Sequence, residues 1–329
     1  MKVIGLRDNI CVKDLKTTCG SKMLENFISP FEATVVEKIN KAGAKIEKVD
    51  ISEFGIEEDK YIATALDKGE IEAIITSDWN GEIARNCVKK AVGIKPTFGL
   101  VSRYGVITIA PSLEQVGVIG RDINKVEETL NLIKGYDSKD SGSVPEKEYN
   151  KQAKSGELTL GYIFDEDVSD NFKGQKSKIE IKHLKYVIPV HNIIASSETS
   201  SSLGKFDGIR YGYKAKDAKT WQEVYTKTRQ EGFGYEAKKK QLLGTFFLDV
   251  ENMQEYYIKA EKIRTVIKRE LDELFKKVDV IVVPHRKEYT CLANLTGRPA
   301  VSINEVTFIG KYFDEQSLIS CAKTYGGDK

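Results

Sequence analysis

The residue types best suited to chemistry lie in two short segments of the first hundred residues. Arg7 follows the apolar run at residues 2–6, and residues 77–82 read SDWNGE. A guanidinium keeps its proton in proteins, so Arg7 can hold a carboxylate but cannot serve as a base. Glu82 brings a carboxylate, and a carboxylate near a pocket needs a cationic partner. We expect Arg7 to pair with Glu82 or Asp78, or to hold the carboxylate of a ligand.

Ser77, Asp78 and Gly81 complete the second segment. A hydroxyl and a carboxylate that follow a strand can orient a small molecule, although such residues more often cap the turn after the strand. The residues alone leave both interpretations open.

Metal and cofactor sites are not predicted. The three histidines are too dispersed for a metal site, and the odd number of scattered cysteines without a Cys-x-x-Cys pair favours reduced thiols in the cytoplasm. We therefore expect no metal and no cofactor. The cysteines are Cys11, Cys19, Cys87, Cys291 and Cys321, and the histidines are His183, His191 and His285.

The charge balance argues against nucleic-acid and membrane partners. The chain has 51 basic and 49 acidic residues, for a net charge of +2, so it carries no strong field of either sign. Its longest apolar runs, such as residues 278–284, have the length of a strand and are too short to cross a membrane. The first residues lead into a strand and lack the layout of a signal peptide.

Hydrophobic periodicity predicts an α/β fold with a mixed, largely parallel central sheet flanked by helices. We expect a single domain over 1–329, with a flexible exposed loop near 135–157, which is rich in Gly, Ser, Lys and Asp. Residues 165–178 are polar and predicted to be irregular. The predicted strands are 2–6, 44–49, 71–76, 106–110, 158–164, 278–284 and 299–303, and the predicted helices are 32–42, 59–68, 122–134, 221–230, 235–248 and 252–277.

Several blocks resemble the amidase signature family, and they follow the order of that family. Within the family they are most similar to the A subunits of the tRNA-dependent glutamyl amidotransferases. The resemblance covers most of the chain and implies a trimmed form of the amidase signature fold. The blocks are GLRDN at 5–9, GIKPTFGLVSRYG at 93–105, APSLEQVG at 110–117, FDGIRYGY at 206–213, RQEGFG at 229–234 and NLTGRPA at 294–300.

The resemblance implies that the catalytic residues are lost. The family uses a lysine, a bridging serine from a Gly/Ser-rich segment and a nucleophilic serine. Arg7 stands at the position of the lysine, and Glu82 stands at the position of the nucleophile. Residues 44–76 contain no counterpart of the Gly/Ser-rich segment. We also expect the bulky Trp79, where the family has a small residue, to crowd the backbone donors of the turn.

The ligand anchors of the family are altered too. The resemblance implies an arginine after the Gly-Phe-Gly segment, but residues 238–241 read KKKQ, and we expect these lysines to form a solvated helix face. No aspartate occurs in residues 285–293, where the family pattern has one. Ser197 and Glu198 match a hydroxyl-rich family segment and are expected in a pocket wall or at a helix start. The predicted remnant pocket comprises Arg7, Ser77, Asp78, Gly81, Glu82, Ser197 and Glu198, with no catalytic residue.

These residues leave two functional hypotheses. In the first, the chain is a catalytically degenerate amidase that acts by binding a small-molecule ligand or a protein such as an amidotransferase B-subunit-like partner. In the second, it is a divergent glutamine amidotransferase or amidase subunit, with Ser77 or Cys87 as the nucleophile. Geometry separates the two, because a nucleophile needs a base within hydrogen-bond reach.

Overall fold

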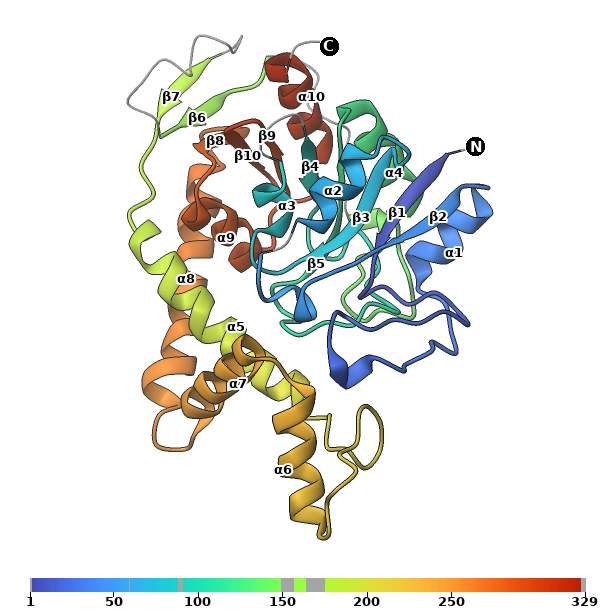
Figure 1. Cartoon of the computed structure of the whole chain (residues 1–329). Helices are drawn as coiled ribbons and strands as arrows, with labels where there is room; N and C mark the ends of the chain where they lie inside the picture. The colour runs from blue at the N-terminus through green and yellow to red at the C-terminus, as the bar shows by residue number, and fades with distance from the viewer. Residues whose placement is uncertain (1, 59, 88–90, 149–156, 164–174, 327–329) are drawn as a thin grey trace.

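A ten-stranded mixed sheet forms the centre of the computed structural model, which describes residues 2–58, 60–87, 91–148, 157–163 and 175–326 (Figure 1). The strand order is β2-β1-β3-β5-β4-β9-β10-β8-β6-β7. The strands are β1 (Val3–Arg7), β2 (Lys45–Val49), β3 (Ala73–Asp78), β4 (Val92–Lys95), β5 (Gln115–Gly120), β6 (Leu160–Tyr162), β7 (Lys176–Lys178), β8 (Val280–Pro284), β9 (Ala300–Ile303) and β10 (Val306–Gly310).

Parallel strand pairs lie at the two ends of this sheet and antiparallel pairs lie at its centre. Strand β1 runs parallel to both β2 and β3, and β6 runs parallel to β7 and β8. The five pairs from β3 to β8 are antiparallel. Strands β9 and β10 are joined by only two residues, which is too short for the crossover that a parallel pair requires. The predicted mixed α/β fold is confirmed, with a smaller parallel share than expected.

Helices cover both faces of the sheet (Figure 1). On one face, apolar residues of α1, α4 and α10 pack with those of the strands, and on the other face α5, α8 and α9 do so. The helices are α1 (Thr34–Lys41), α2 (Tyr61–Asp67), α3 (Glu82–Arg85), α4 (Ile123–Ile133), α5 (Val187–Leu203), α6 (Trp221–Gly232), α7 (Tyr235–Leu248), α8 (Lys259–Leu274), α9 (Lys287–Thr296) and α10 (Glu315–Gly326), with short turns η1 (Lys22–Leu24), η2 (Glu53–Gly55), η3 (Glu146–Glu148), η5 (Leu184–Tyr186) and the π-helical η6 (Gln254–Ile258).

The strand predicted at 106–110 is wrong, because this segment makes only an isolated bridge between Val106 and Ile10. Strand β5 was not predicted. Gly117 is needed inside the strand for close packing: a Cβ atom there would lie 2.3 Å from the Ile94 carbonyl oxygen. The strands β4 and β10 and the helices α5, α9 and α10 were also not predicted.

The two segments expected to be irregular are only partly described by the structure. Within 135–157, residues 149–156 lie outside the described residues, and the part before them is packed: Asp137 is buried and accepts hydrogen bonds from Thr34 and Ser102, both at 2.6 Å. These hydroxyl partners explain why a polar segment is held in place. Within the predicted irregular segment 165–178, residues 165–174 lie outside the described residues, and 176–178 form β7 instead.

Helix α7 packs closely on α5, and Gly244 makes this possible. A Cβ atom at Gly244 would lie 2.0 Å from the carbonyl oxygen of Ser196, which is far inside normal contact. The missing side chain therefore sets the distance between the two helices.

Replacing Gly244→Ala should lower the free energy of unfolding by about 1–3 kcal/mol, because the two helix backbones must move apart. Denaturant unfolding measures the loss. Gly204→Ala is the matched control, since Gly204 has a helical φ of −59° and its nearest added contact would be 3.2 Å. A Gly244→Ala protein as stable as this control would contradict the close packing.

Candidate functional site

A buried ion pair joins Arg7 to Glu82, which is one of the three partners that the sequence left open for Arg7. Arg7 is the last residue of β1 and is 0% exposed, and Glu82 is the first residue of α3 and is 6% exposed. Nη2 of Arg7 donates to Oε1 of Glu82 at 2.7 Å. The two residues meet because β1 and β3 are parallel neighbours, so their carboxyl ends lie at the same edge of the sheet.

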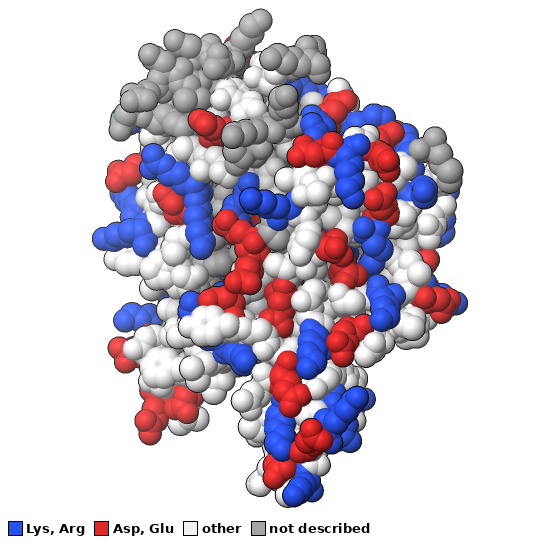
Figure 2. Space-filling model, in the orientation of Figure 1, with Lys and Arg blue, Asp and Glu red and all other residues white. Residues whose placement is uncertain are grey.

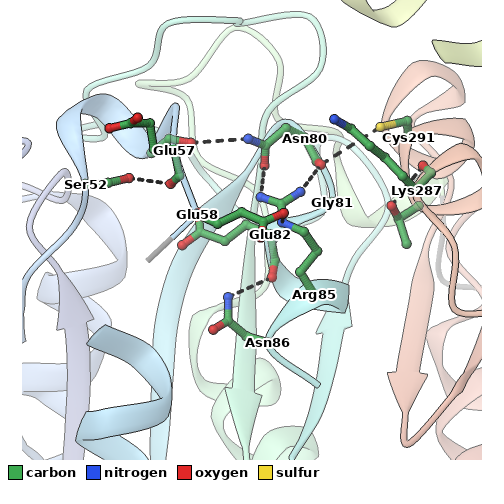
Figure 3. Close-up of polar contacts among 12 residues, drawn as sticks. Ser52, Glu57, Glu58, Asn80, Gly81, Glu82, Arg85, Asn86, Lys287 and Cys291 are labelled. Carbon is green, nitrogen blue, oxygen red and sulfur yellow. Dashed lines mark hydrogen bonds and ion pairs between the residues drawn. The ribbon is translucent and has the colours of Figure 1, made fainter. Parts of the chain in front are cut away.

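A short segment after β2, residues 50–57, covers this pair. Arg7 donates through Nη1 to the carbonyl oxygen of Asp50, and Asn80 donates to the carbonyl oxygen of Gly55 at 3.2 Å. Phe54 is buried between Phe206 and Phe233, with ring centroids 6.2 and 6.3 Å away. Figure 3 shows this segment, marked by Ser52 and Glu57, beside Asn80 and Glu82. The chain's own residues therefore close the space above the ion pair.

A groove of about 640 Å³ lies on the other side of the same segment. Neither Arg7 nor Glu82 lines it, so the groove gives no direct access to the ion pair. Its charged lining residues are Asp8, Asp50, Glu53, Glu57, Glu231 and Lys22.

Asp78 holds the turn between β3 and α3. Its carboxylate accepts from the backbone N–H groups of Asn80 at 3.1 Å, Gly81 at 2.6 Å and Ile83 at 2.9 Å, and from the Asn294 side chain at 3.2 Å. These bonds are those of a residue that caps a turn, which was the structural alternative for Asp78. The three N–H groups are consequently occupied and not directed at a ligand.

Gly81 permits the same turn. It has a φ of +81°, in the left-handed region that glycine favours, and a Cβ atom there would lie 2.4 Å from Oγ1 of Thr290. Gly81 therefore serves the backbone path and the contact with α9.

Ser77 belongs to a buried polar network that sequence reasoning missed. Its hydroxyl accepts from Asn9 at 2.7 Å and forms a hydrogen bond with Glu114. Burial raises the pKa of Glu114 to about 7, and the charge of Glu82 adds to the rise, while the bond with Ser77 and the charge of Arg103 oppose it. The only sequence signal was the position of Glu114 inside the block at 110–117.

Of the two candidate nucleophiles, only Ser77 has a carboxyl group within reach. The thiol of Cys87 is fully buried and donates to the Ile83 carbonyl oxygen at 3.0 Å. Burial raises the pKa of this thiol far above its ordinary value, and the charge of Asp78 adds to the rise, which favours the unreactive thiol over the thiolate at neutral pH. The geometry removes Cys87 and keeps Ser77 as the residue to test.

Trp79 does not crowd the turn as expected, because its indole stacks on His191 of α5. The two rings are nearly parallel, with centroids 6.2 Å apart, and Nε2 of His191 donates to the Trp79 carbonyl oxygen at 2.8 Å. Burial lowers the pKa of His191 to about 4, so the imidazole is neutral at pH 7.

Lys240 is not part of a solvated helix face, which corrects the expectation for residues 238–241. Its ammonium lies 5.1 Å from the centre of the Trp79 ring. Burial and the neighbouring charge of Lys287 lower the pKa of Lys240. Figure 3 shows Lys287 reaching from α9 toward Asn80. The two lysines thus bring positive charge to the outer side of the turn.

Ser197 and Glu198 serve a different part of the fold. Glu198 accepts from the backbone N–H of Ser112 at 2.9 Å, and Arg264 donates to the same Ser112 at 2.8 Å through each of two nitrogens. Burial raises the pKa of Glu198. Ser197 is buried inside α5. The structure therefore gathers Arg7, Ser77, Asp78, Gly81 and Glu82 at the ends of β1 and β3, and places Ser197 and Glu198 on α5.

Within the described ranges, no group of three or more His, Cys, Asp or Glu side chains is arranged to hold a metal ion. No helix in that part of the chain is long and apolar enough to cross a membrane. On the face shown in Figure 2, basic and acidic side chains are interspersed, in keeping with the near balance of charge in the sequence.

Comparison with known proteins places this geometry in a family. The amidase family model matches residues 3–56 and 87–309 and leaves 57–86, the segment of Ser77 to Glu82, unmatched. The A subunit of the glutamyl-tRNA(Gln) amidotransferase of Sulfurihydrogenibium is 35% identical over 394 aligned positions, covering 97% of this chain and 81% of the relative. Its counterpart in Methanosarcina barkeri is 34% identical and covers 98% and 83%.

Solved structures agree. The crystal structure of the same amidotransferase component from Thermotoga maritima is 26% identical, with a TM-score of 0.73, and covers 98% of this chain and 82% of that one. An allophanate hydrolase of Kluyveromyces lactis shares the fold at 18% identity, with a TM-score of 0.76, and covers 98% and 61%.

Breaking the buried pair should be costly. Glu82→Gln leaves the Arg7 guanidinium buried without its carboxylate, and we expect a loss of about 3–5 kcal/mol in denaturant unfolding. The double variant Arg7→Met with Glu82→Met removes both charges and should be more stable than Glu82→Gln. Glu273→Gln, in the exposed pair with Lys276, should change stability by less than about 1 kcal/mol. Equal effects of Glu82→Gln and Glu273→Gln would refute the burial argument.

Glu114 should make stability depend on pH. Its pKa is about 7 in the folded chain against an ordinary 4.5, so the folded state holds the proton more tightly and loses stability as pH rises from about 4.5 through 7. Glu114→Gln removes this titration. The variant should gain up to about 3 kcal/mol relative to the wild type at pH 8, and much less at pH 5. Denaturant unfolding of both proteins between pH 5 and pH 8 measures this effect. If the stability difference between Glu114→Gln and the wild type did not change with pH, the raised pKa of Glu114 would be contradicted.

Proposed function

This chain belongs to the amidase family, and we propose that it is a catalytically degenerate member, related to the A subunits of the tRNA-dependent amidotransferases, that acts by binding a ligand or a protein. The observation that carries this proposal is the buried ion pair of Arg7 and Glu82. The resemblance to the family implies that these two residues stand at the positions of its base and its nucleophile.

Amide hydrolysis needs a nucleophile, a base that activates it and donors that stabilise the oxyanion. Arg7 cannot accept a proton, and the carboxylate of Glu82 is engaged by that guanidinium at 2.7 Å. Three N–H groups of the turn donate to Asp78. The segment at 50–57 covers the ion pair. In this proposal the chain supplies neither the base nor the nucleophile that the family chemistry uses.

The interrupted family match supports the same proposal. The family model resumes at residue 87, after skipping the segment that contains Ser77 and Glu82. The sequence alignment with the Sulfurihydrogenibium relative spans 394 positions, more than the 329 residues of this chain, so the relative carries segments that this chain does not. The unmatched stretch at 57–86 includes Ser77 and Glu82, which supports the proposal that this part of the chain has diverged from the family.

We propose an amidotransferase B-subunit-like protein, or else a small molecule, as the partner. The relatives are named as A subunits, and the blocks at 206–213 and 229–234 that resemble them remain in this chain. We propose no direct contact with nucleic acid and none with a membrane. All five cysteines are buried and unpaired, which fits a cytoplasmic location.

A second candidate function rests on Ser77 and Glu114. A serine hydrogen-bonded to a carboxyl group with a pKa of about 7 is a pair that could exchange a proton at neutral pH. In that function the chain is a divergent amidase or glutamine amidotransferase subunit that works with a B-subunit-like partner. Both side chains are almost fully buried, which favours the first proposal over this one.

Purified protein should release no ammonia from glutamine above the buffer rate, alone or with a B-subunit-like partner, because no activated nucleophile is accessible. The relative from Thermotoga maritima under the same conditions is the positive control. Ammonia release that Ser77→Ala abolishes would establish the second function and refute the first. Ser317→Ala, a buried serine on α10, controls for effects of losing a buried hydroxyl.

A further inference from the structure

The outward side of α7 is apolar although it faces solvent. Tyr235 is 75% exposed, Leu242 73% and Phe246 47%, and Val250 just beyond the helix is 87% exposed. The inward side already packs on α5 through Ala237 and Gly244. Large apolar side chains on both sides of a helix are expected where both sides are covered, and within the described part of the chain only the inward side is covered.

The spacing on this outward side is that of a helix-pairing seam. Tyr235, Leu242 and Phe246 are its apolar members, Lys239 lies between the first two at the same spacing, and Asp249 follows directly after the helix end at Leu248. This is the heptad spacing that keeps one stripe of a helix against a neighbouring helix. The pattern therefore specifies the shape of the occupant as another α-helix.

The end of the seam is held in a fixed shape. The rings of Phe246, Phe247 and Tyr256 contact one another, with centroids 5.4 to 5.7 Å apart. An aromatic surface that is already ordered loses little conformational entropy when a partner covers it.

Charge along the seam specifies the direction and the partner. The first half carries the exposed Lys238 and Lys239, and exposed carboxylates of Asp249 and Glu251 follow the helix end. Lys239 is partly offset by Glu236 of the same helix, at 3.3 Å. An antiparallel copy of α7 centred at residue 244 would place Lys239 opposite Asp249 and Leu242 opposite Phe246. The helix is thus complementary to itself in both charge and apolar contact.

We propose that α7 is a self-association surface, on which α7 of a second copy of this chain docks antiparallel. We choose a second copy as the occupant because its own α7 carries apolar residues at the matching spacing. It also has a basic start and is followed by acidic residues, so its charges complement those of this face. The site is separate from the Arg7–Glu82 region, so the proposal does not depend on whether the chain is catalytic. A single helix pair is at the small end of specific interfaces, so the dimer should be weak and reversible.

Sedimentation velocity on the full chain over about 5 to about 200 µM tests the proposal, and we expect a monomer–dimer equilibrium in this range. Leu242→Glu should weaken association at least about tenfold, because it puts a charge into the apolar seam. Ile28→Glu, at a 55% exposed position outside α7, is the matched control and should leave association unchanged. Circular dichroism of each variant establishes that it is folded.

A charge exchange tests the antiparallel register. Lys239→Asp and Asp249→Lys should each weaken association by about three- to tenfold, since each sets like charges opposite one another. The double variant Lys239→Asp with Asp249→Lys should recover to within about threefold of the wild type. A wild type that stays monomeric throughout the range would overturn the proposal and leave the face to a different protein. Dimerisation that survives Leu242→Glu, or a double variant that recovers nothing, would overturn it equally.

Discussion

The burial of one guanidinium is the constraint on which the rest of the site depends. Arg7 is fully enclosed, so its charge and its N–H groups must be met by acceptors inside the protein. Glu82 supplies the carboxylate and the Asp50 carbonyl supplies a further acceptor, which ties together the end of β1, the start of α3 and the segment after β2. These contacts with Arg7 fix the three elements relative to one another. The hydrogen bonds of Asp78 in turn orient helix α3, which carries Glu82.

The ion pair could be predicted from the sequence because two simple rules coincide there. The carboxyl ends of parallel neighbouring strands share one edge of the sheet, and a buried charge needs a partner. The covering segment could not be predicted. Phe54 adopts a φ of +51°, which a non-glycine residue seldom does, and its burial depends on Phe206 and Phe233, more than 150 residues away along the chain. The raised pKa of Glu114 could not be predicted either, because it is caused by burial among residues that are distant in the sequence.

The roles of α5 and α7 show the same limit. Trp79 and His191 are 112 residues apart in the sequence, so no local sequence pattern predicts that their rings stack. Lys240 looked like one of three equivalent lysines, yet only the packing of α7 on α5 decides which of them turns inward. The tight contact at Gly244 fixes that rotation. Conversely, the strands and helices with strong periodicity, such as β8 and α7, lie where they were predicted, because burial on one side of a regular element leaves its trace in the sequence.

The short segment after β2 couples two kinds of burial. It carries the buried ring of Phe54, and its carbonyl oxygens accept hydrogen bonds from the side chains of Arg7 and Asn80. Opening this segment would expose an aromatic ring and a buried charge in the same step. The segment and the ion pair are therefore expected to open together, as one cooperative unit.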